Sequence, residues 1–239
     1  MNTILVINGK GGVGKTTIAT NLASYFAAAG VPTAIMDYDP QGSSLHWLSQ
    51  RPGLVRTIHG ANAAPQIGGG LRSMRMYVPH DTQQLIVDAP AGASKLLLQE
   101  LLSKANSIVV PVAPSSIDVH ATAGFIKELL LSGRIRIRKI RLAVVANRVR
   151  RSRTVYEPLE RFVQALDMEF LTRLSDSEIY IEAAESGVGI FEMDADLGRR
   201  EREEFMPIVR WAERREFLTT HRSSEIVPFR PRHQRVFST

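Results

Sequence analysis

The sequence contains no cysteine. Disulfide bonds, thiolate metal sites and cysteine-ligated iron–sulfur clusters are therefore excluded. Histidine is scarce, and the six histidines show no spacing typical of metal ligands. No apolar run approaches the roughly 18 residues that a membrane span requires. The N-terminus has no basic-then-apolar stretch followed by a small-residue cleavage site, so we expect a cytoplasmic protein that is not exported.

Lysine is also scarce, with six residues against 24 arginines, and the formal net charge is +6 at pH 7. Nine basic residues and no acidic residue lie between Arg134 and Arg153. A basic chain of this kind can bind a polyanion such as DNA or an anionic membrane. A solvated basic face without a partner is equally compatible with the charge alone.

Short apolar segments alternate with helical patterns along the chain. Strands are predicted at 3–8, 32–39, 85–90, 107–112 and 140–147, and helices at 16–30, 94–104, 116–131, 155–167 and 205–218. Continuous apolar strands separated by helices predict an α/β fold, in which helices cover both faces of a mostly parallel, twisted sheet.

The chain shows no linker that would divide it into two domains. We expect one domain over residues 1–218, with a loop at 51–72 and with Pro207 in the first turn of the last helix. Residues 219–239 contain two prolines and four arginines against one glutamate, which predicts a basic, poorly ordered tail.

The stretch GKGGVGKTT, residues 9–17, lies between the first predicted strand and the first predicted helix. Gly9, Gly14, Lys15 and Thr16 satisfy the phosphate-loop pattern G-x-x-x-x-G-K-[ST] in its required context. Glycines let successive backbone N–H groups point at phosphate oxygens, and the helix N-terminus adds positive potential. Lys15 should reach the β- and γ-phosphates, and the Thr16 hydroxyl should bind Mg²⁺. The sequence therefore predicts a single P-loop domain that binds a nucleoside triphosphate.

Three aspartates end predicted strands beside this loop. Asp88 ends the apolar run LIVD, and Asp37 and Asp39 end the second strand, where alternation places both on one face. Carboxylates next to a triphosphate can support a metal ion or order an attacking water. Alternatively, Asp88 caps the helix of the segment that follows it. In the same way, either Asp37 or Asp39 could cap the helix that begins near Ser43.

The strings KGGVGKTT, DYDPQGSS and IVDAP together resemble the deviant Walker A family of ParA and MinD ATPases. The D-x-D-P-Q-G string is closest to the ParA branch. Two later segments, VVPVAPSSIDVHATAGFI and TRLSDSEIYIEAAESGVGIFE, extend the resemblance over roughly residues 1–195. The resemblance implies ATP and Mg²⁺ as ligands, and a face-to-face homodimer when ATP is bound.

The family roles carry over to matching positions. The resemblance implies phosphate contacts from Gly11, Gly12, Val13, Gly14, Lys15, Thr16 and Thr17. It gives catalytic roles to Lys10, Lys15 and Asp39, with Asp39 positioning the attacking water. Thr16, Asp37 and Asp88 would surround Mg²⁺, with Asp88 acting through water. Asn147 would contact the adenine.

Lys10 is the extra lysine of the loop. The resemblance implies that it crosses the dimer interface and touches the phosphates of the opposite subunit. Two facing triphosphates carry several negative charges, which a lysine from each side would offset. Nucleotide state would then bias a monomer–dimer equilibrium, and a cargo-bound adaptor would accelerate a slow ATPase. The alternative is that Lys10 is simply an exposed lysine of the loop.

The resemblance leaves two partners for the dimer, non-specific DNA as in ParA or membrane as in MinD. The C-terminal segment VPFRPRHQRVFST cannot form a regular amphipathic helix across two prolines, so we expect no stable membrane association. Arginines can instead contact DNA phosphates. The candidates are Arg134, Arg136 and Arg138, which share one face if that segment is an extended strand, and a second cluster of Arg148, Arg150, Arg151 and Arg153.

The sequence thus predicts a nucleoid-associated ATPase that positions a plasmid, a chromosome origin or a protein assembly such as a carboxysome. No helix-turn-helix precedes the P-loop, so operator-specific binding is not expected. One alternative is a MinD-like membrane-associated regulator of division. Another is a P-loop metabolic synthetase, although no second cluster of catalytic polar residues is apparent. The sequence identifies neither the cargo nor the activating partner.

Overall fold

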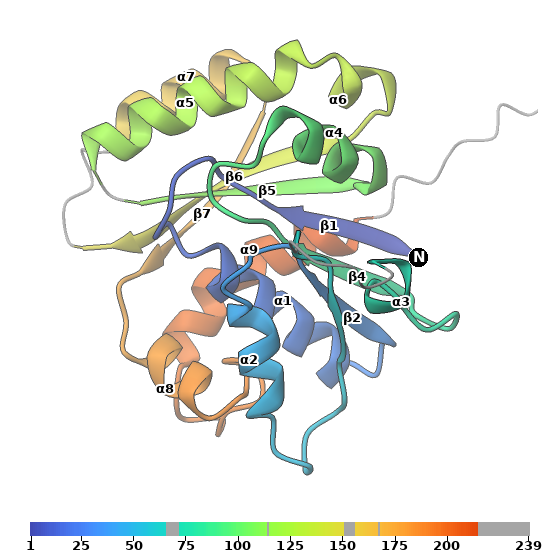
Figure 1. Cartoon of the computed structure of the whole chain (residues 1–239). Coiled ribbons are helices and arrows are strands. Elements are labelled where there is room, and N and C mark those ends of the chain that lie inside the picture. The colour runs from blue at the N-terminus through green and yellow to red at the C-terminus, as the bar shows by residue number, and fades with distance from the viewer. Residues whose placement is uncertain (66–71, 114, 151–155, 167, 215–239) are drawn as a thin grey trace, which may run out of the picture.

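The protein folds around one parallel β-sheet (Figure 1). The structure is a computed structural model, and it describes residues 1–65, 72–113, 115–150, 156–166 and 168–214. The described residues form seven strands in the order β3-β2-β4-β1-β5-β6-β7, and every neighbouring pair is parallel. The strands are β1 (Asn2–Val6), β2 (Thr33–Asp37), β3 (His59–Asn62), β4 (Gln84–Asp88), β5 (Ser107–Val112), β6 (Arg141–Val149) and β7 (Glu169–Ser175). The predicted α/β fold is confirmed.

Helices cover both faces of the sheet, also as predicted. They are α1 (Lys15–Ala28), α2 (Ser43–Ser49), α3 (Arg72–Arg75), α4 (Lys95–Lys104), α5 (Ser116–Leu131), α6 (Arg134–Ile137), α7 (Glu157–Ala165), α8 (Ile179–Glu185) and α9 (Arg199–Glu213). In Figure 1, α4, α5, α6 and α7 lie over one face, and α1, α2, α8 and α9 lie over the other. Successive residues of β1 alternate between the two cores: Ile4 packs on the α1 side and Leu5 on the α5 side.

The order of the strands determines where on the sheet the P-loop lies. The chain runs from β1 to β2 on one side, and later from β4 to β5 on the opposite side of β1. In open parallel sheets, ligands bind outside the carboxyl ends of the strands where the chain changes direction in this way. The P-loop follows the carboxyl end of β1, so the fold puts it at this point.

Two edge strands were not predicted. The segment 51–72, expected to be a loop, contains β3, which pairs with β2. A Cβ at Gly60 would lie 2.8 Å from Leu48 and 2.9 Å from Leu45, so glycine lets β3 approach α2 closely. Strand β7 forms the other edge and pairs with β6. Both strands lack a continuous apolar run, which explains why hydrophobicity alone did not reveal them.

The basic segment RIRIR is helical, so the condition under which its arginines would share one strand face is not met. Gly133 takes a left-handed conformation, with φ of 70°, and the short helix α6 follows directly. Ile135 is buried whereas Ile137 is 82% exposed, although both would lie on one face of a strand. Arg134, Arg136 and Arg138 therefore do not form a row on one strand face.

The last described helix begins earlier than predicted. Helix α9 starts at Arg199, after Gly198, so Pro207 lies in the interior of the helix rather than in its first turn. One face of the helix packs into the core, where Phe205, Ile208 and Val209 are fully buried. The predicted domain end at residue 218 and the tail at 219–239 lie outside the described residues. None of the described helices combines the length and the apolar character that crossing a bilayer needs.

Candidate nucleotide-binding site

The loop between β1 and α1 has the backbone shape that a phosphate site requires. Gly12 and Gly14 have φ values of 74° and 86°, a region that residues with a side chain rarely adopt. Asn147 donates from its Nδ2 to the carbonyl of Val13 at 2.9 Å, which ties the end of β6 to the loop. A Cβ at Gly14 would lie only 1.9 Å from that nitrogen. Gly14 is therefore required by its conformation and by the neighbouring amide.

Lys15 begins α1 and is only 7% exposed. Its Nζ donates to the backbone carbonyl of Lys10 at 3.1 Å, across the mouth of the loop. Burial lowers the pKa of Lys15, and the carboxylates of Asp88 and Asp39 act in the opposite direction. The ammonium group thus stands beside two carboxylates in a water-poor site, where a phosphate could replace the carbonyl as its partner.

Thr16 and Asp88 lie together, as the sequence predicted. The Thr16 hydroxyl donates to Oδ2 of Asp88 at 2.8 Å, and Asp88 is 1% exposed. Burial raises the pKa of Asp88 to about 7, with the Thr16 hydrogen bond opposing the shift and the Asp37 carboxylate adding to it. A buried carboxylate with an elevated pKa favours a nearby cation.

This donor set fits Mg²⁺. Mg²⁺ is commonly bound by one or two protein oxygens together with substrate phosphates and water. Thr16 and Asp88 offer a hydroxyl and a carboxylate side by side at the start of α1. Within the described part of the chain, no group of three or more His, Cys, Asp or Glu side chains could hold a metal ion. Thr16 and Asp88 would hold Mg²⁺ together with nucleotide phosphates and water.

Asp37 caps a helix, which was the alternative left open by the sequence. It is fully buried, and its Oδ2 accepts from the Ser44 hydroxyl at 2.7 Å and from the Ser44 backbone N–H at 3.2 Å. The Leu45 N–H lies 3.4 Å from the same oxygen, and Oδ1 accepts from the N–H of Asp39 at 2.9 Å. These bonds fix the start of α2 and the turn that carries Asp39.

Asp39 lies two residues beyond the end of β2 and is partly exposed. Its Oδ1 accepts from the N–H of Gln41 at 3.0 Å, a local turn contact that fixes the side chain. The Asp39 carboxylate raises the pKa of both Lys15 and Asp88, so its charge acts on the phosphate site. Asp37 and Asp39 have separate environments, because one is a buried cap and the other borders solvent.

The Lys10 side chain pairs with a residue outside its own loop. Its Nζ lies 3.7 Å from Oδ1 of Asp118 in the first turn of α5, and its side chain is 46% exposed. The backbone N–H of Lys10 donates to Oδ1 of Asn8 at 3.1 Å. Asp118 is held by Ser115, whose hydroxyl donates to the carboxylate at 2.6 Å and accepts from the Asp118 N–H at 3.0 Å.

Sequence reasoning missed Asn8 and Asp118. The pattern S-x-x-D at 115–118 signals a helix start, and it could have revealed that Asp118 has a fixed position. Nothing in the sequence pairs it with a lysine more than a hundred positions earlier. The P-loop glycines, Lys15, Thr16, Asp39, Asp88 and Asn147 were predicted to lie together, and the structure brings them to one edge of the sheet.

The candidate DNA-contacting arginines lie in two places. Arg134, Arg136 and Arg138 are in or just after α6, before β6 begins, whereas Arg148 and Arg150 follow its buried part. A nine-residue strand such as β6 spans roughly 26 Å between its ends, so the structure separates the two groups. Arg150 pairs with Asp176 at 2.8 Å. Arg151 and Arg153 lie outside the described residues.

The sequence is similar to a known family of nucleotide-binding domains and to individual proteins of known name. Residues 4–190 match the model of the CobQ/CobB/MinD/ParA nucleotide binding domain. The chain is 27% identical over 199 residues to the maintenance of carboxysome distribution protein A (McdA) of Halothiobacillus neapolitanus, covering 81% of this chain and 88% of the relative. It is 31% identical over 172 residues to the protein of the same name from Gloeobacter kilaueensis, covering 68% of this chain and 76% of that protein.

Solved structures share the fold. A Cyanothece McdA variant in complex with ATP is similar to this chain with a TM-score of 0.66 at 15% identity, covering 89% of this chain and 96% of the other. This likeness shows the fold, and the match of residues 4–190 to the family model shows the family. The chain therefore belongs to the CobQ/CobB/MinD/ParA family of nucleotide-binding domains.

Proposed function

We propose that the chain is a cytoplasmic ATPase that forms a homodimer when it binds ATP and Mg²⁺, and that the dimer binds nucleoid DNA without sequence preference. A cargo-bound adaptor protein stimulates hydrolysis and releases the dimer locally. The two relatives named for carboxysome distribution favour a protein assembly as the cargo, ahead of a plasmid or a chromosome origin.

The orientation of Lys10 carries this proposal. A lysine that served only its own nucleotide would turn toward the loop, as Lys15 does. Lys10 instead lies half-exposed against Asp118, while its carbonyl holds Lys15. An exposed ion pair of this kind contributes little stability, so the ammonium is available to a negatively charged group that approaches from outside. The γ-phosphate held by a second copy of the chain supplies such a group.

The roles of the remaining site residues follow from their positions. Lys15 and the backbone N–H groups of residues 11–17 would hold the phosphates, with Mg²⁺ near Thr16 and Asp88. Asp39 borders the site without being buried, as a residue that positions water must. Asn147 uses its amide nitrogen for Val13, which leaves its amide oxygen for the adenine.

The proposed DNA contacts come from two groups of arginines. Arg148 and Arg150 lie near the carboxyl edge of the sheet, and Arg134, Arg136 and Arg138 form the α6 group. Arg151 and Arg153 remain candidates from the sequence alone. Paired variants that remove Arg134 and Arg136, or Arg148 and Arg150, separate the two, because each removes two charges. The group that contacts DNA is the one whose loss flattens the dependence of binding on salt, by about 0.9 in log–log slope per phosphate contact.

The test combines mass and binding measurements. Light scattering after gel filtration should show a dimer with ATP or a slowly hydrolysed analogue and a monomer with ADP. A gel shift with random-sequence duplex should show binding only in the triphosphate state. Lys15→Ala serves as the nucleotide-binding control. A monomer in every nucleotide state would refute the proposal, and a dimer that bound anionic liposomes instead of duplex would replace it with the MinD-like alternative.

A further inference from the structure

A second cavity lies at the opposite edge of the sheet from the nucleotide site. It has a volume of about 730 Å³ and opens where the strands begin, with Asn2 of β1, Gln83 before β4, Asn106 before β5 and Arg141 of β6 on its walls. We call it the amino-end hollow. Roughly 300 to 1,000 Å³ is the usual range for sites that bind small molecules, so the hollow is large enough for such a ligand.

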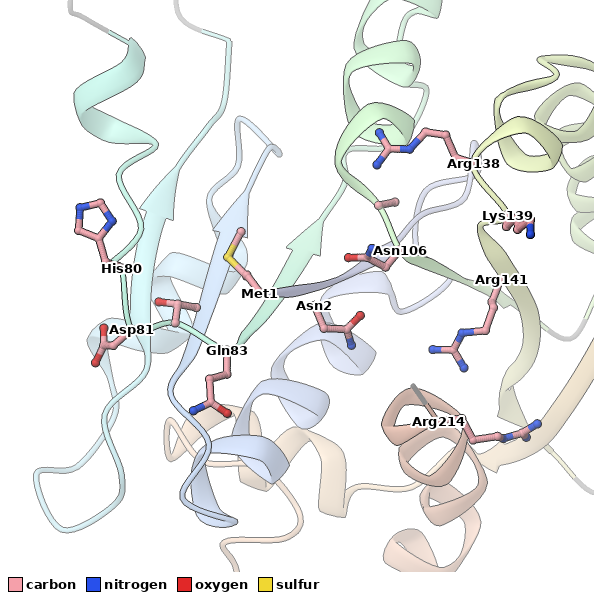
Figure 2. Close-up of a pocket in the computed structure, with 12 residues that line it drawn as sticks. Met1, Asn2, His80, Asp81, Gln83, Asn106, Arg138, Lys139, Arg141 and Arg214 are labelled. Atoms are coloured by element: carbon pink, nitrogen blue, oxygen red, sulfur yellow. The ribbon is translucent and has the colours of Figure 1, made fainter. Parts of the chain in front are cut away.

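Positive charge gathers on one side of the amino-end hollow. Figure 2 shows Arg138, Lys139, Arg141 and Arg214 on that side, whereas Asp81 stands across from them. These residues come from the turn after α6, the first position of β6 and the end of α9, so folding brings the cations together from separate segments.

Two of these cations have fixed surroundings. Arg141 donates to the carbonyl of Trp211 at 2.7 Å, and its guanidinium carbon lies 4.6 Å from the centre of the Trp211 ring. Arg214 pairs with Glu169 at 3.0 Å. Arg141 is thus held in place beside the hollow, which lowers the entropic cost of binding a ligand there.

The other two cations lack an acidic partner in the part of the chain that the structure describes. Arg138 and Lys139 are both exposed, and no described carboxylate lies within ion-pair distance of either. Two unneutralised cations beside an anchored arginine favour an anion that carries more than one oxygen acceptor, as a phosphate group does.

The rest of the wall carries amides. Asn106 accepts the N–H of Thr3 at 2.8 Å through its Oδ1, which leaves the amide nitrogen to donate to a ligand. Gln83 contributes a second amide across the hollow (Figure 2). Amides of this kind can bind hydroxyl groups, so the wall suits a polar molecule rather than an apolar one.

We propose that the amino-end hollow binds a phosphorylated small molecule, with its phosphate against Arg138, Lys139 and Arg141 and its polar part against Asn106 and Gln83. The site is separate from the P-loop and does not depend on the proposed function. A rigid DNA duplex cannot enter a concavity of this size, so the shape favours a small ligand over nucleic acid. This role replaces, for Arg138, the DNA contact proposed for it together with Arg134 and Arg136, neither of which lines the hollow.

The test uses the full chain saturated with Mg²⁺ and ADP, so that the P-loop is filled. Ribose 5-phosphate is the probe, measured by saturation-transfer NMR and calorimetry, with ribose and inorganic phosphate as separate arms. We expect ribose 5-phosphate to bind at millimolar concentration or below, ribose not to bind, and inorganic phosphate to compete.

The decisive comparison is between two double variants that each remove two charges. Arg138→Gln/Lys139→Asn should weaken ribose 5-phosphate binding by at least about tenfold, because charge-assisted hydrogen bonds are lost. Asn suits position 139, where φ is 52°. Arg134→Gln/Arg136→Gln, on α6 but outside the hollow, should change binding by less than about twofold. Unchanged melting temperatures would show that both variants fold.

Three outcomes would overturn the proposal. The first is that ribose 5-phosphate fails to bind at millimolar concentration. The second is that the two double variants lose equal affinity, which would indicate general charge attraction. If a short DNA duplex bound through Arg138 and Lys139 while ribose 5-phosphate did not bind, the residues would belong to a nucleic-acid surface instead.

Discussion

The ammonium group of Lys10 lies 3.7 Å from the carboxylate of Asp118 in the same chain. Asp118 is fixed by Ser115 at the start of α5, whereas the Lys10 side chain is nearly half exposed. Lys10 is therefore oriented by a neighbour that it can leave at small cost, because exposed ion pairs contribute little.

Lys10→Ala should abolish the ATP-dependent dimer while leaving nucleotide binding by the monomer nearly unchanged. The substitution removes the half-exposed side chain but retains the carbonyl that accepts from Lys15. Light scattering would measure the dimer, and fluorescence titration would measure nucleotide affinity. Lys127→Ala, which removes an exposed lysine from α5, is the matched control. A Lys10→Ala protein that still dimerised with ATP would exclude the interfacial role.

Asp39→Ala should trap the ATP-bound dimer on DNA. Loss of a group that positions the attacking water is expected to slow turnover by about 100-fold or more. Single-turnover phosphate release would measure hydrolysis, and the lifetime of the DNA complex would measure trapping. Hydrolysis at the wild-type rate would refute the water-positioning role of Asp39.

Asp37→Ala should destabilise the fold far more than Asp39→Ala does. The first removes a buried carboxylate that accepts from Ser44 and from the start of α2, and it leaves those donors without a partner. We expect a loss of about 2 to 3 kcal/mol in the free energy of unfolding, against about 0.5 kcal/mol for the partly exposed Asp39. Urea denaturation of the nucleotide-free proteins would measure both, and equal losses would contradict the capping role.

Asp88 should make the nucleotide-free, metal-free protein less stable as pH rises. Its pKa in the folded state is about 7, above the ordinary value of 3.8, so the folded protein binds more protons than the unfolded chain between these values. The free energy of unfolding should therefore fall by up to roughly 1.4 kcal/mol per pH unit in that window and level off above pH 7. Urea denaturation across pH would reveal this slope. Asp88→Asn should remove it, and an unchanged slope in that variant would assign the effect to other groups.

Gly14→Ala should abolish nucleotide binding and lower stability. The new Cβ would lie 1.9 Å from the amide nitrogen of Asn147, at a φ of 86°. Gly124→Ala, within α5, has no atom near the added Cβ and should stabilise the protein by about 0.5 to 1 kcal/mol. Thermal unfolding and ADP titration of both variants would test the pair. Normal binding by Gly14→Ala would show that the loop can accept a side chain.

Much of this architecture could be predicted because it depends on local patterns. Continuous apolar strands and the loop motif are enough to predict that Lys15, Thr16 and Asp88 lie together. The edge strands β3 and β7 were not predicted, because each pairs with another strand on one side only and its apolar pattern is weak. The helical form of α6 depends on the turn at Gly133 and on burial of Ile135, which five alternating residues do not reveal.

The contacts within the site were harder to predict than the residues that form it. Asp37 and Asp39 are two positions apart and belong to the same motif. Only the tertiary structure shows that Asp37 accepts a hydrogen bond from Ser44. The pairing of Lys10 with Asp118 joins residues 108 positions apart and leaves no periodic signal. Long-range polar contacts of this kind depend on how the strands are ordered, and that order is not a local property.

The hydrogen bond from Lys15 to the carbonyl of Lys10 has a thermodynamic consequence. The Thr16 hydroxyl also donates a hydrogen bond to Asp88. In the nucleotide-free protein, the Lys15 ammonium and the Thr16 hydroxyl therefore already have hydrogen-bond partners. A phosphate that arrives must exchange with these internal partners instead of filling a set of waiting donors. The measured affinity is then a difference between two bonded arrangements, and substitutions that weaken the internal bonds can tighten nucleotide binding without touching the ligand.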